Sequence, residues 1–256
     1  MNFNNIRMSC IRQLCINYHK RYSAASEVLN ITKNSTEKGN IRGNYFDAEE
    51  NLTVPFHFWS AESHNKPLIV YFGGSGTVGC CNLANSVEFL AYAGGKDILC
   101  SDVNILVPQM IILGRNEFDN IYGYVSSCCH LITALSTRYS FDTKNIRIYG
   151  TSLGGMCVWN MLLFHPDMIN KALSVTGEYS GYSCLTVNDF SPLKNKSIWL
   201  VHADDDKVVS PQCDITCYPM IMEICTDTIF TRYSSGGHHI SKRFYNTHEH
   251  IRWLTE

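Results

Sequence analysis

From residue 50 onward, short apolar segments with the pattern of β-strands alternate with longer segments that have the pattern of helices. Residues 53–61 alternate large apolar side chains with smaller or polar ones, which is typical of a half-buried strand. Residues 68–72 form a continuous apolar run, which is typical of a strand buried on both faces. Further strands are predicted at 104–109, 145–150, 171–177, 197–203 and 227–234, and helices at 83–95, 122–139, 156–164 and 244–254.

This alternation predicts an α/β protein with a mostly parallel central sheet and helices on both of its faces. The length of 256 residues suits one large domain of this class. Residues 1–43 are polar and rich in Asn and Ser, and we expect a loosely ordered lead-in segment there, followed by one domain over residues 44–256. The strands at 171–177 and 197–203 are separated by a connection too short for a large cap domain, which predicts a shallow, open site.

Composition and charge exclude several classes of protein. With 45% hydrophobic and 17% charged residues, the chain is globular rather than disordered. Its net charge of −2 gives no electrostatic reason to expect binding to nucleic acid or to an anionic membrane. No apolar run approaches the length of a membrane span. The sequence leaves the oligomeric state open.

The cysteines and the N-terminus bear on the cellular location. Twelve cysteines are many for a chain of this length, but Cys80–Cys81 and Cys128–Cys129 are adjacent pairs, and Cys157 lies in an apolar segment. The N-terminal segment lacks the unbroken apolar stretch of a secretory signal. These features favour reduced thiols and a cytoplasmic location.

The stretch IRIYGTSLGGM, residues 146–156, joins a predicted strand to a predicted helix by a very tight turn. Such a turn forces its central residue into a strained backbone conformation, which requires neighbours without bulky side chains. The residues Gly150 to Gly154 fit the pattern G-x-S-x-G of a nucleophile elbow, with Ser152 at its centre. The alternative interpretation is a glycine-rich turn that happens to contain a serine.

The residues that follow the other predicted strands distinguish these interpretations. A serine nucleophile needs an imidazole to accept its proton, a carboxylate to orient the imidazole, and two donors for the oxyanion. The strand at 68–72 is followed by a glycine loop, the strand at 197–203 by the aspartates at 204–206, and the strand at 227–234 by His238 and His239. In open parallel sheets these carboxyl ends meet at the ligand-binding edge. Because Leu153 begins the helix after the serine, its N–H is expected to point into the site as one oxyanion donor.

The order Ser, Asp, His is that of the α/β-hydrolase superfamily. Over residues 50–256 the sequence resembles its single-domain esterases, which include feruloyl esterases, polyhydroxybutyrate depolymerases and prolyl-oligopeptidase-like enzymes. The resemblance rests on KPLIVYFGGSGTVG, NILVPQ, RYSFDTKNIRIYGTSLGGMCVWNMLLFHPDMI, SIWLVHADDDKVVS and FTRYSSGGHH. It implies an α/β-hydrolase fold and hydrolysis of a carboxylic ester, or less often an amide, through an acyl-serine. No metal or organic cofactor is implied.

The resemblance also assigns the catalytic roles. The pattern His-Gly-x-x-Asp-x-x-Val falls on residues 202–209 and makes Asp206 the acid, with Asp204 or Asp205 in a turn or at the surface. Glu178 is an alternative acid, and His202 is interpreted as structural. A Gly-His pattern favours His238 over His239 as the base.

The same resemblance covers the loop after residues 68–72. This loop usually reads His-Gly-x-Gly, which places Gly73 where the histidine stands. The N–H of Ser75 then becomes the second oxyanion donor, and Gly74 and Gly76 shape the loop around the substrate. The missing histidine raises the question of what holds this loop in place.

Three further residues are candidates for substrate binding. Tyr179 and Tyr182 lie in a loop that opens at the active face, and His239 is expected at the edge of the pocket. The sequence therefore predicts a serine esterase that acts on a small-molecule or carbohydrate-linked ester. Two alternatives are a serine peptidase of the prolyl-oligopeptidase type and a non-catalytic binding protein with a hydrolase fold.

Overall fold

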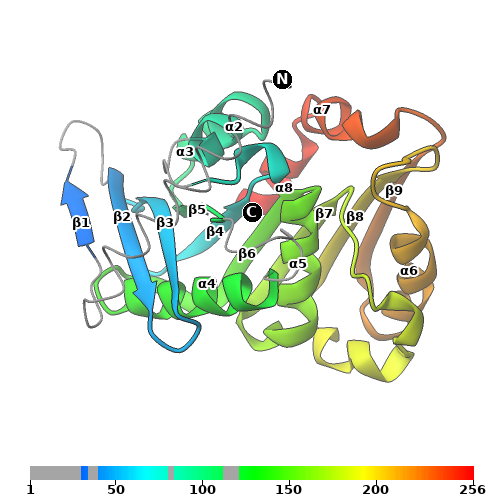
Figure 1. The fold of residues 1–256 in the computed structure, drawn as a ribbon, viewed down its shortest axis with the longest axis horizontal. Coiled ribbons are helices and arrows are strands. Elements are labelled where there is room, and N and C mark those ends of the chain that lie inside the picture. The colour runs from blue at the N-terminus through cyan, green and yellow to red at the C-terminus, as the bar shows by residue number, and fades with distance from the viewer. Residues whose placement is uncertain (1–29, 34–39, 80–83, 112–120) are drawn as a thin grey trace, which may run out of the picture.

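The structure is a computed structural model that describes residues 30–33, 40–79, 84–111 and 121–256. Within these residues, nine strands form one sheet in the order β1-β2-β3-β5-β4-β6-β7-β8-β9, which runs from left to right in Figure 1. Strands β1 to β3 and the β3–β5 pair are antiparallel, and all the remaining pairs are parallel. The strands are β1 Asn30–Lys33, β2 Asn40–Asp47, β3 Leu52–Trp59, β4 Lys66–Phe72, β5 Asn104–Pro108, β6 Phe141–Thr151, β7 Ile169–Val175, β8 Ser197–Ala203 and β9 Asp227–Tyr233. The predicted mostly parallel sheet is confirmed.

Helices cover both faces of this sheet. One core cluster includes side chains from α4 Ile121–Ser136, α5 Leu153–Phe164 and α6 Gln212–Ile224. A second cluster, on the other face, includes side chains from α2 Ala84–Tyr92, α3 Gly95–Leu99, α7 Ile240–Tyr245 and α8 Glu249–Thr255. Figure 1 shows α2, α3 and α7 on one side of the strands and α4, α5 and α6 on the other.

The central strand β4 shows why continuous apolar runs become strands covered on both sides. Leu68, Val70 and Phe72 belong to the first core cluster, whereas Ile69 and Tyr71 belong to the second. Successive side chains of a strand point to opposite faces, so an unbroken apolar run supplies both cores at once. Full burial of each such side chain contributes roughly 1.5–3 kcal/mol to the stability of the sheet.

The antiparallel strands extend the sheet toward the N-terminus. The expected boundary between residues 43 and 44 falls inside β2, whose residues 40–47 pair along their whole length with β3. β1 pairs in turn with β2, so the sheet reaches back to residue 30. Residues 1–29, which make up most of the expected lead-in segment, lie outside the described residues.

The single closing helix predicted at 244–254 is wrong, because the structure divides this segment into α7 and α8. His248 lies between them with φ of 59°, a left-handed conformation that ends a helix. The hydroxyl of Thr247 donates to the carbonyl of Phe244 at 2.9 Å, and such a local bond competes with continued helical pairing. His248 is therefore outside a helix, whereas His250 lies inside α8 and is buried.

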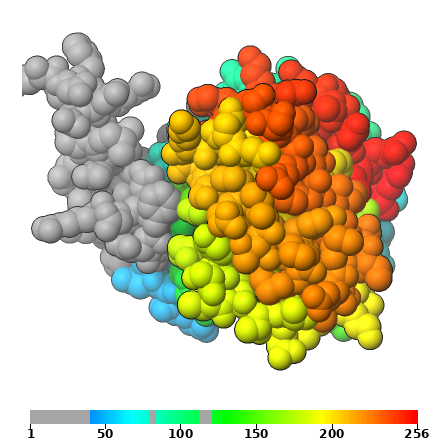
Figure 2. Space-filling view, turned by 90° about the vertical axis from the view of Figure 1, so that its right-hand side faces the viewer, coloured from blue at the N-terminus to red at the C-terminus, as the bar shows by residue number. Residues whose placement is uncertain are grey.

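Between β7 and β8, residues 176–196 form only short 3-10 segments, η4 Tyr182–Cys184 and η5 Val187–Leu193, so this connection carries no cap domain. Figure 2 shows that the β9 end of the molecule is formed mainly by the C-terminal part of the chain, coloured yellow to red. Among the described residues, no helix is both long and apolar enough to span a lipid bilayer. The carboxyl ends of β4, β6, β7, β8 and β9 all open at one edge of the sheet, where the polar residues singled out above follow them.

Candidate active site

Ser152 lies in a tight turn between β6 and α5, with φ of 57° and ψ of −117°. This conformation is strained for a residue with a side chain, and the Ser152 N–H is held by the carbonyl of Val175 at 2.8 Å. The turn is possible because its neighbours approach closely. A Cβ on Gly150 would lie 2.6 Å from the backbone of Gly154, and a Cβ on Gly154 would collide with the Phe72 carbonyl. The sequence prediction of a strained serine between obligatory glycines is confirmed in its geometry.

The structure brings Ser152, His238 and Asp206 together from three different strand ends. His238 Nε2 lies 2.8 Å from Ser152 Oγ, and His238 Nδ1 lies 2.8 Å from Asp206 Oδ2. Asp206 Oδ1 accepts hydrogen bonds from the N–H groups of Val208 and Val209 at 2.8 and 3.1 Å. Burial acts to raise the pKa of Asp206, but these hydrogen bonds outweigh it and hold the pKa below its ordinary value. An ionised Asp206 accepts a hydrogen bond from the Nδ1–H of His238, and this tautomer leaves the Nε2 lone pair facing Ser152.

The three consecutive aspartates have separate partners. Asp204 forms an ion pair with Arg232 at the surface. Asp205 accepts a hydrogen bond from the N–H of Gly237 at 2.7 Å, and this bond is the main reason that the pKa of Asp205 is lowered. Asp206 alone reaches His238, so the three side chains point to three different places. Asp205 thus fixes the turn that carries the histidine, whereas Asp204 lies at the surface, which are the two places expected for these aspartates.

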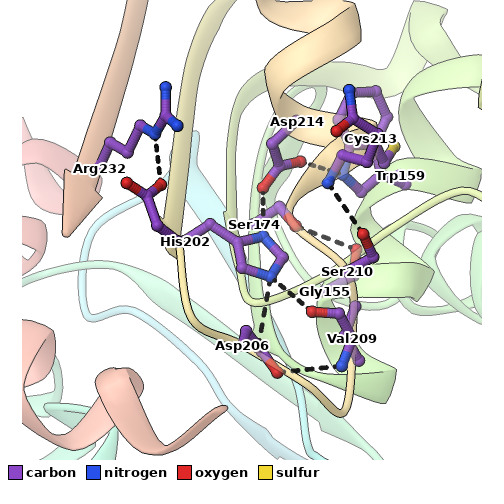
Figure 3. A network of polar contacts seen from close by, with 12 residues as sticks. Gly155, Trp159, Ser174, His202, Asp206, Val209, Ser210, Cys213, Asp214 and Arg232 are labelled. Atoms are coloured by element: carbon purple, nitrogen blue, oxygen red, sulfur yellow. Dashed lines mark hydrogen bonds and ion pairs between the residues drawn. The ribbon is translucent and has the colours of Figure 1, made fainter. Parts of the chain in front are cut away.

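Behind Asp206 lies a buried polar network that sequence reasoning did not find (Figure 3). His202 Nε2 lies 3.3 Å from Asp206 Oδ2 and 3.1 Å from the Val209 carbonyl, while its Nδ1 lies 2.7 Å from Asp214 Oδ2. The indole N–H of Trp159 donates to the other carboxylate oxygen of Asp214 at 3.1 Å. Burial alone would lower the pKa of His202, but the two carboxylates outweigh it and raise the pKa. Asp214 follows a loop and lies within α6, so no strand end in the sequence pointed to it.

The two candidate oxyanion donors both begin a helical segment. Leu153 is the first residue of α5, and Ser75 is the first residue of the 3-10 helix η1 Ser75–Thr77. The first N–H groups of a helix have no carbonyl acceptor within it and remain available to a ligand. Ser75, Leu153, Ser152 and His238 all line one cavity, so both helix starts face the space in front of the serine hydroxyl.

The loop that carries Ser75 is held by a carboxylate from α2. Glu88 Oε1 accepts the N–H of Gly74 at 3.0 Å and a short hydrogen bond from the hydroxyl of Tyr71. The Gly74 carbonyl accepts both the N–H and the hydroxyl of Thr77, at 3.0 and 2.8 Å. A Cβ on Gly73 would collide with the side chains of Thr77 and Asn85, so a histidine there would require both of these side chains to move. The sequence analysis did not identify Glu88, because a glutamate on a helix is usually interpreted as a solvent-exposed side chain.

The residues predicted to bind substrate lie in different places. Tyr179 lines the cavity with Ser152, whereas Tyr182 in η4 packs against the first core cluster and is not part of the lining. His239 is exposed beside His238, with 6.4 Å between the ring centroids. Gly74 lines a smaller neighbouring cavity beside Glu88, and a Cβ on Gly76 would meet nothing within 4 Å.

The cavity in front of Ser152 has a volume of about 490 Å³. Glu178, the alternative acid, lies in its wall and makes no hydrogen bond or ion pair to His238 among the described residues. Val208 is 74% exposed at the rim, so the cavity opens to solvent. The apolar part of the wall comes from Ile121, Tyr122, Leu153, Met156, Tyr179, Val208 and Val209.

No group of three or more His, Cys, Asp or Glu side chains in the described ranges is arranged to hold a metal ion. Each cysteine in the described part of the chain is a free thiol, including the buried Cys128, Cys129 and Cys157. Burial raises the pKa of Cys129 to about 12, which disfavours its thiolate. The pair Cys80–Cys81 lies outside the described residues.

A family model described as phospholipase/carboxylesterase matches residues 117–254, more than half of the chain. No curated protein matches the chain by sequence.

Solved structures show the same architecture. A thermostable esterase superposes with a TM-score of 0.69 at 21% identity over 84% of this chain, which spans only 62% of the length of that esterase. The feruloyl esterase module from Clostridium thermocellum complexed with sinapinate superposes with a TM-score of 0.62 at 10% identity, and the match covers 91% of this chain and 95% of that one. S-formylglutathione hydrolase from Staphylococcus aureus superposes with a TM-score of 0.62 at 11% identity, and the match covers 86% of this chain and 100% of that one. These likenesses confirm the expected α/β-hydrolase fold.

Proposed function

Because the chain belongs to the phospholipase/carboxylesterase family, we propose that it hydrolyses carboxylic esters through an acyl intermediate on Ser152. The observation that carries the proposal is the unbroken hydrogen-bonded chain from Ser152 through His238 to Asp206, with 2.8 Å at each step. A serine hydroxyl is a weak nucleophile at neutral pH, and an imidazole at this distance removes its proton as it attacks.

In the first step, Ser152 Oγ attacks the ester carbonyl while His238 Nε2 accepts the hydroxyl proton. Asp206 stabilises the resulting imidazolium through the bond to Nδ1 and keeps the ring oriented. The carbonyl oxygen becomes an oxyanion, for which the N–H groups of Leu153 and Ser75 are the proposed donors. The imidazolium then returns its proton to the departing alcohol, and an acyl-serine remains.

In the second step, water attacks the acyl-serine. His238 accepts a proton from this water, and the same two N–H groups stabilise the second tetrahedral oxyanion. Collapse of this intermediate returns the proton to Ser152 Oγ and releases the carboxylic acid. Glu88 supports both steps indirectly, because it fixes the backbone of Gly74 next to the Ser75 donor.

The proposed substrate is a small-molecule or carbohydrate-linked ester. The cavity of about 490 Å³ is large enough for one small acyl or alcohol group, and its open rim lets the rest of the substrate stay in solvent. The names of the similar structures, a feruloyl esterase and an S-formylglutathione hydrolase, are consistent with substrates of this size.

A fluorophosphonate probe tests the proposal directly, since it reacts only with an activated serine. Labelling of the wild type that is lost in Ser152→Ala supports a working nucleophile, whereas an unlabelled wild type indicates a binding protein. Turnover of acetyl, feruloyl and longer-chain esters, beside aminoacyl amides, separates an esterase from a peptidase.

Two pairs of variants test the assignment of the triad. His238→Ala should lower ester turnover by about 10⁴-fold or more, whereas His239→Ala should change it little. Asp206→Asn should lower ester turnover far more than Asp205→Asn, because only Asp206 contacts the imidazole. If Asp205→Asn or His239→Ala were the more damaging member of its pair, the proposed triad would be wrong.

A further inference from the structure

Glu178 reaches the wall of the catalytic cavity because the chain turns sharply after β7. Thr176 takes a φ of 49°, and the next residue, Gly177, lies directly against Gly155 in the first turn of α5. A Cβ on Gly155 would be 2.8 Å from the Cα of Gly177, so nothing larger than glycine fits between the two segments. This close contact brings the following residue, Glu178, over the start of α5, where it lines the cavity with Ser152.

In the part of the chain that the structure describes, no lysine or arginine forms an ion pair with the Glu178 carboxylate. Among the described residues it makes no hydrogen bond and no ion pair, and no lysine or arginine lines the cavity with it. Its side chain is half-buried, and burial is the main cause that raises its pKa, with Asp214 and Asp206 adding to the effect and His202 opposing it. A carboxylate that is partly removed from water without an ion-pair partner is costly. A ligand that supplies a positive charge would relieve this cost.

Two aromatic rings line the same cavity as Glu178, and a third ring, outside the lining, packs against both to complete an aromatic ledge. Tyr122 and Tyr179 both line the cavity, and Phe164 lies between them, with ring-centroid distances of 5.1 Å to Tyr122 and 6.0 Å to Tyr179. Tyr122 and Phe164 remain 54% and 43% exposed, although large aromatic side chains are usually buried. Aromatic faces attract cations, and aromatic residues with a nearby carboxylate are a known way to recognise ammonium groups.

We propose that Glu178, with the aromatic ledge of Tyr122, Phe164 and Tyr179, selects esters that carry a positively charged ammonium group in their acyl or alcohol part. This inference rests on the proposed esterase function and specifies its substrate class. The ester bond is cleaved at Ser152, and the charged group is held by the wall of the cavity.

Pairs of esters that differ only in charge test the inference. Acetylcholine and 3,3-dimethylbutyl acetate place the trimethylammonium group or its neutral isostere in the alcohol part. The 4-methylumbelliferyl esters of 4-(trimethylammonio)butanoate and 5,5-dimethylhexanoate do the same in the acyl part. For at least one pair, the wild type should show a higher kcat/KM for the charged ester, and Glu178→Gln should lower the charged-to-neutral ratio about tenfold or more.

Two controls separate charge recognition from other effects. Glu223→Gln removes the same charge from an exposed position on α6 and should keep the wild-type ratio. Added NaCl should lower the ratio of the wild type, which requires no variant to fold. A ratio that stays the same in Glu178→Gln for both pairs would overturn the inference, as would equal losses with charged and neutral esters. If the wild type hydrolysed none of the four esters and escaped the fluorophosphonate probe, the proposed function itself would fail.

Discussion

The most informative single substitution at this site removes Glu88, which holds the loop that carries the proposed oxyanion donor Ser75. Glu88 Oε1 accepts the N–H of Gly74 at 3.0 Å and the hydroxyl of Tyr71, and Gly74 directly precedes the proposed donor Ser75. We expect Glu88→Ala to lower kcat while KM stays nearly the same, because the loop positions a donor that acts mainly on the charged intermediate.

The size of the decrease in kcat can be estimated from the hydrogen bonds that Glu88→Ala removes and from those that it leaves in place. A hydrogen bond to a charged group contributes about 1.5–3 kcal/mol, which corresponds to roughly 10–150-fold in rate. Complete loss of one oxyanion donor costs about 10²–10³-fold in kcat and sets the upper limit. Thr77 still holds the Gly74 carbonyl through its N–H and hydroxyl, so we expect a loss of about 10–100-fold in kcat.

The assay is steady-state hydrolysis of a neutral ester, together with the rate of fluorophosphonate labelling, because phosphonylation passes through the same oxyanion site. The expected order of kcat is wild type, then Tyr71→Phe, then Glu88→Gln, then Glu88→Ala. Tyr71→Phe leaves the carboxylate in place, and glutamine keeps an acceptor of similar shape without the charge. A thermal melt of each variant shows whether the fold is intact. An unchanged kcat in a folded Glu88→Ala protein, or a loss confined to KM, would refute the idea that Glu88 positions the donor.

Three further predictions concern stability. Gly154→Ala should destabilise the protein by about 3 kcal/mol or more and abolish activity, since its Cβ would collide with the carbonyl at the end of β4, whereas Gly76→Ala should stay within about 0.5 kcal/mol in a urea titration. Burial and a neighbouring arginine lower the pKa of His57 to about 4, so the unfolded state binds its proton first as the pH falls. As the pH falls from 6.5 to 4, the free energy of unfolding of the wild type should therefore decrease by up to about 1.4 kcal/mol per pH unit more than that of His57→Gln. If the free energies of unfolding of the two proteins changed in parallel with pH, the lowered pKa of His57 would be contradicted. Asp214→Asn breaks a fully buried pair and should cost about 3–5 kcal/mol, whereas Asp204→Asn breaks a surface pair and should cost less than about 1 kcal/mol, as measured by chemical denaturation.

The parts of the fold that depend on local pattern could be predicted from the sequence. Apolar runs such as residues 68–72 identified the central strands, because a strand covered on both faces has no position that tolerates a charge. The closing helix was predicted as one element because residues 244–254 keep a helical distribution of apolar side chains on both sides of the break. The break itself depends on a hydroxyl–carbonyl bond and a left-handed His248, which the pattern of apolar positions does not encode.

Some residues of the site could be predicted from the sequence and others could not, for a physical reason. Ser152 could be identified because its strained turn needs glycines at fixed spacing, and the glycines are visible in the sequence. Positions after strands that share one edge of the sheet pointed to the aspartates at 204–206 and to His238 or His239, and the family resemblance selected Asp206 and His238 among them. Glu88 and Asp214 could not be found this way, because both lie on helices and reach the site only through the packing of those helices against the sheet.

That difference bears on how this chain compensates for the histidine it lacks after β4. A side chain at position 73 would collide with the side chains of Thr77 and Asn85, so this position supplies no group that could hold the loop. Thr77 holds the Gly74 carbonyl from within the loop, and Glu88 on α2 holds the Gly74 N–H from outside it. A carboxylate accepts from a backbone N–H as a histidine can, but it also adds negative charge beside the site.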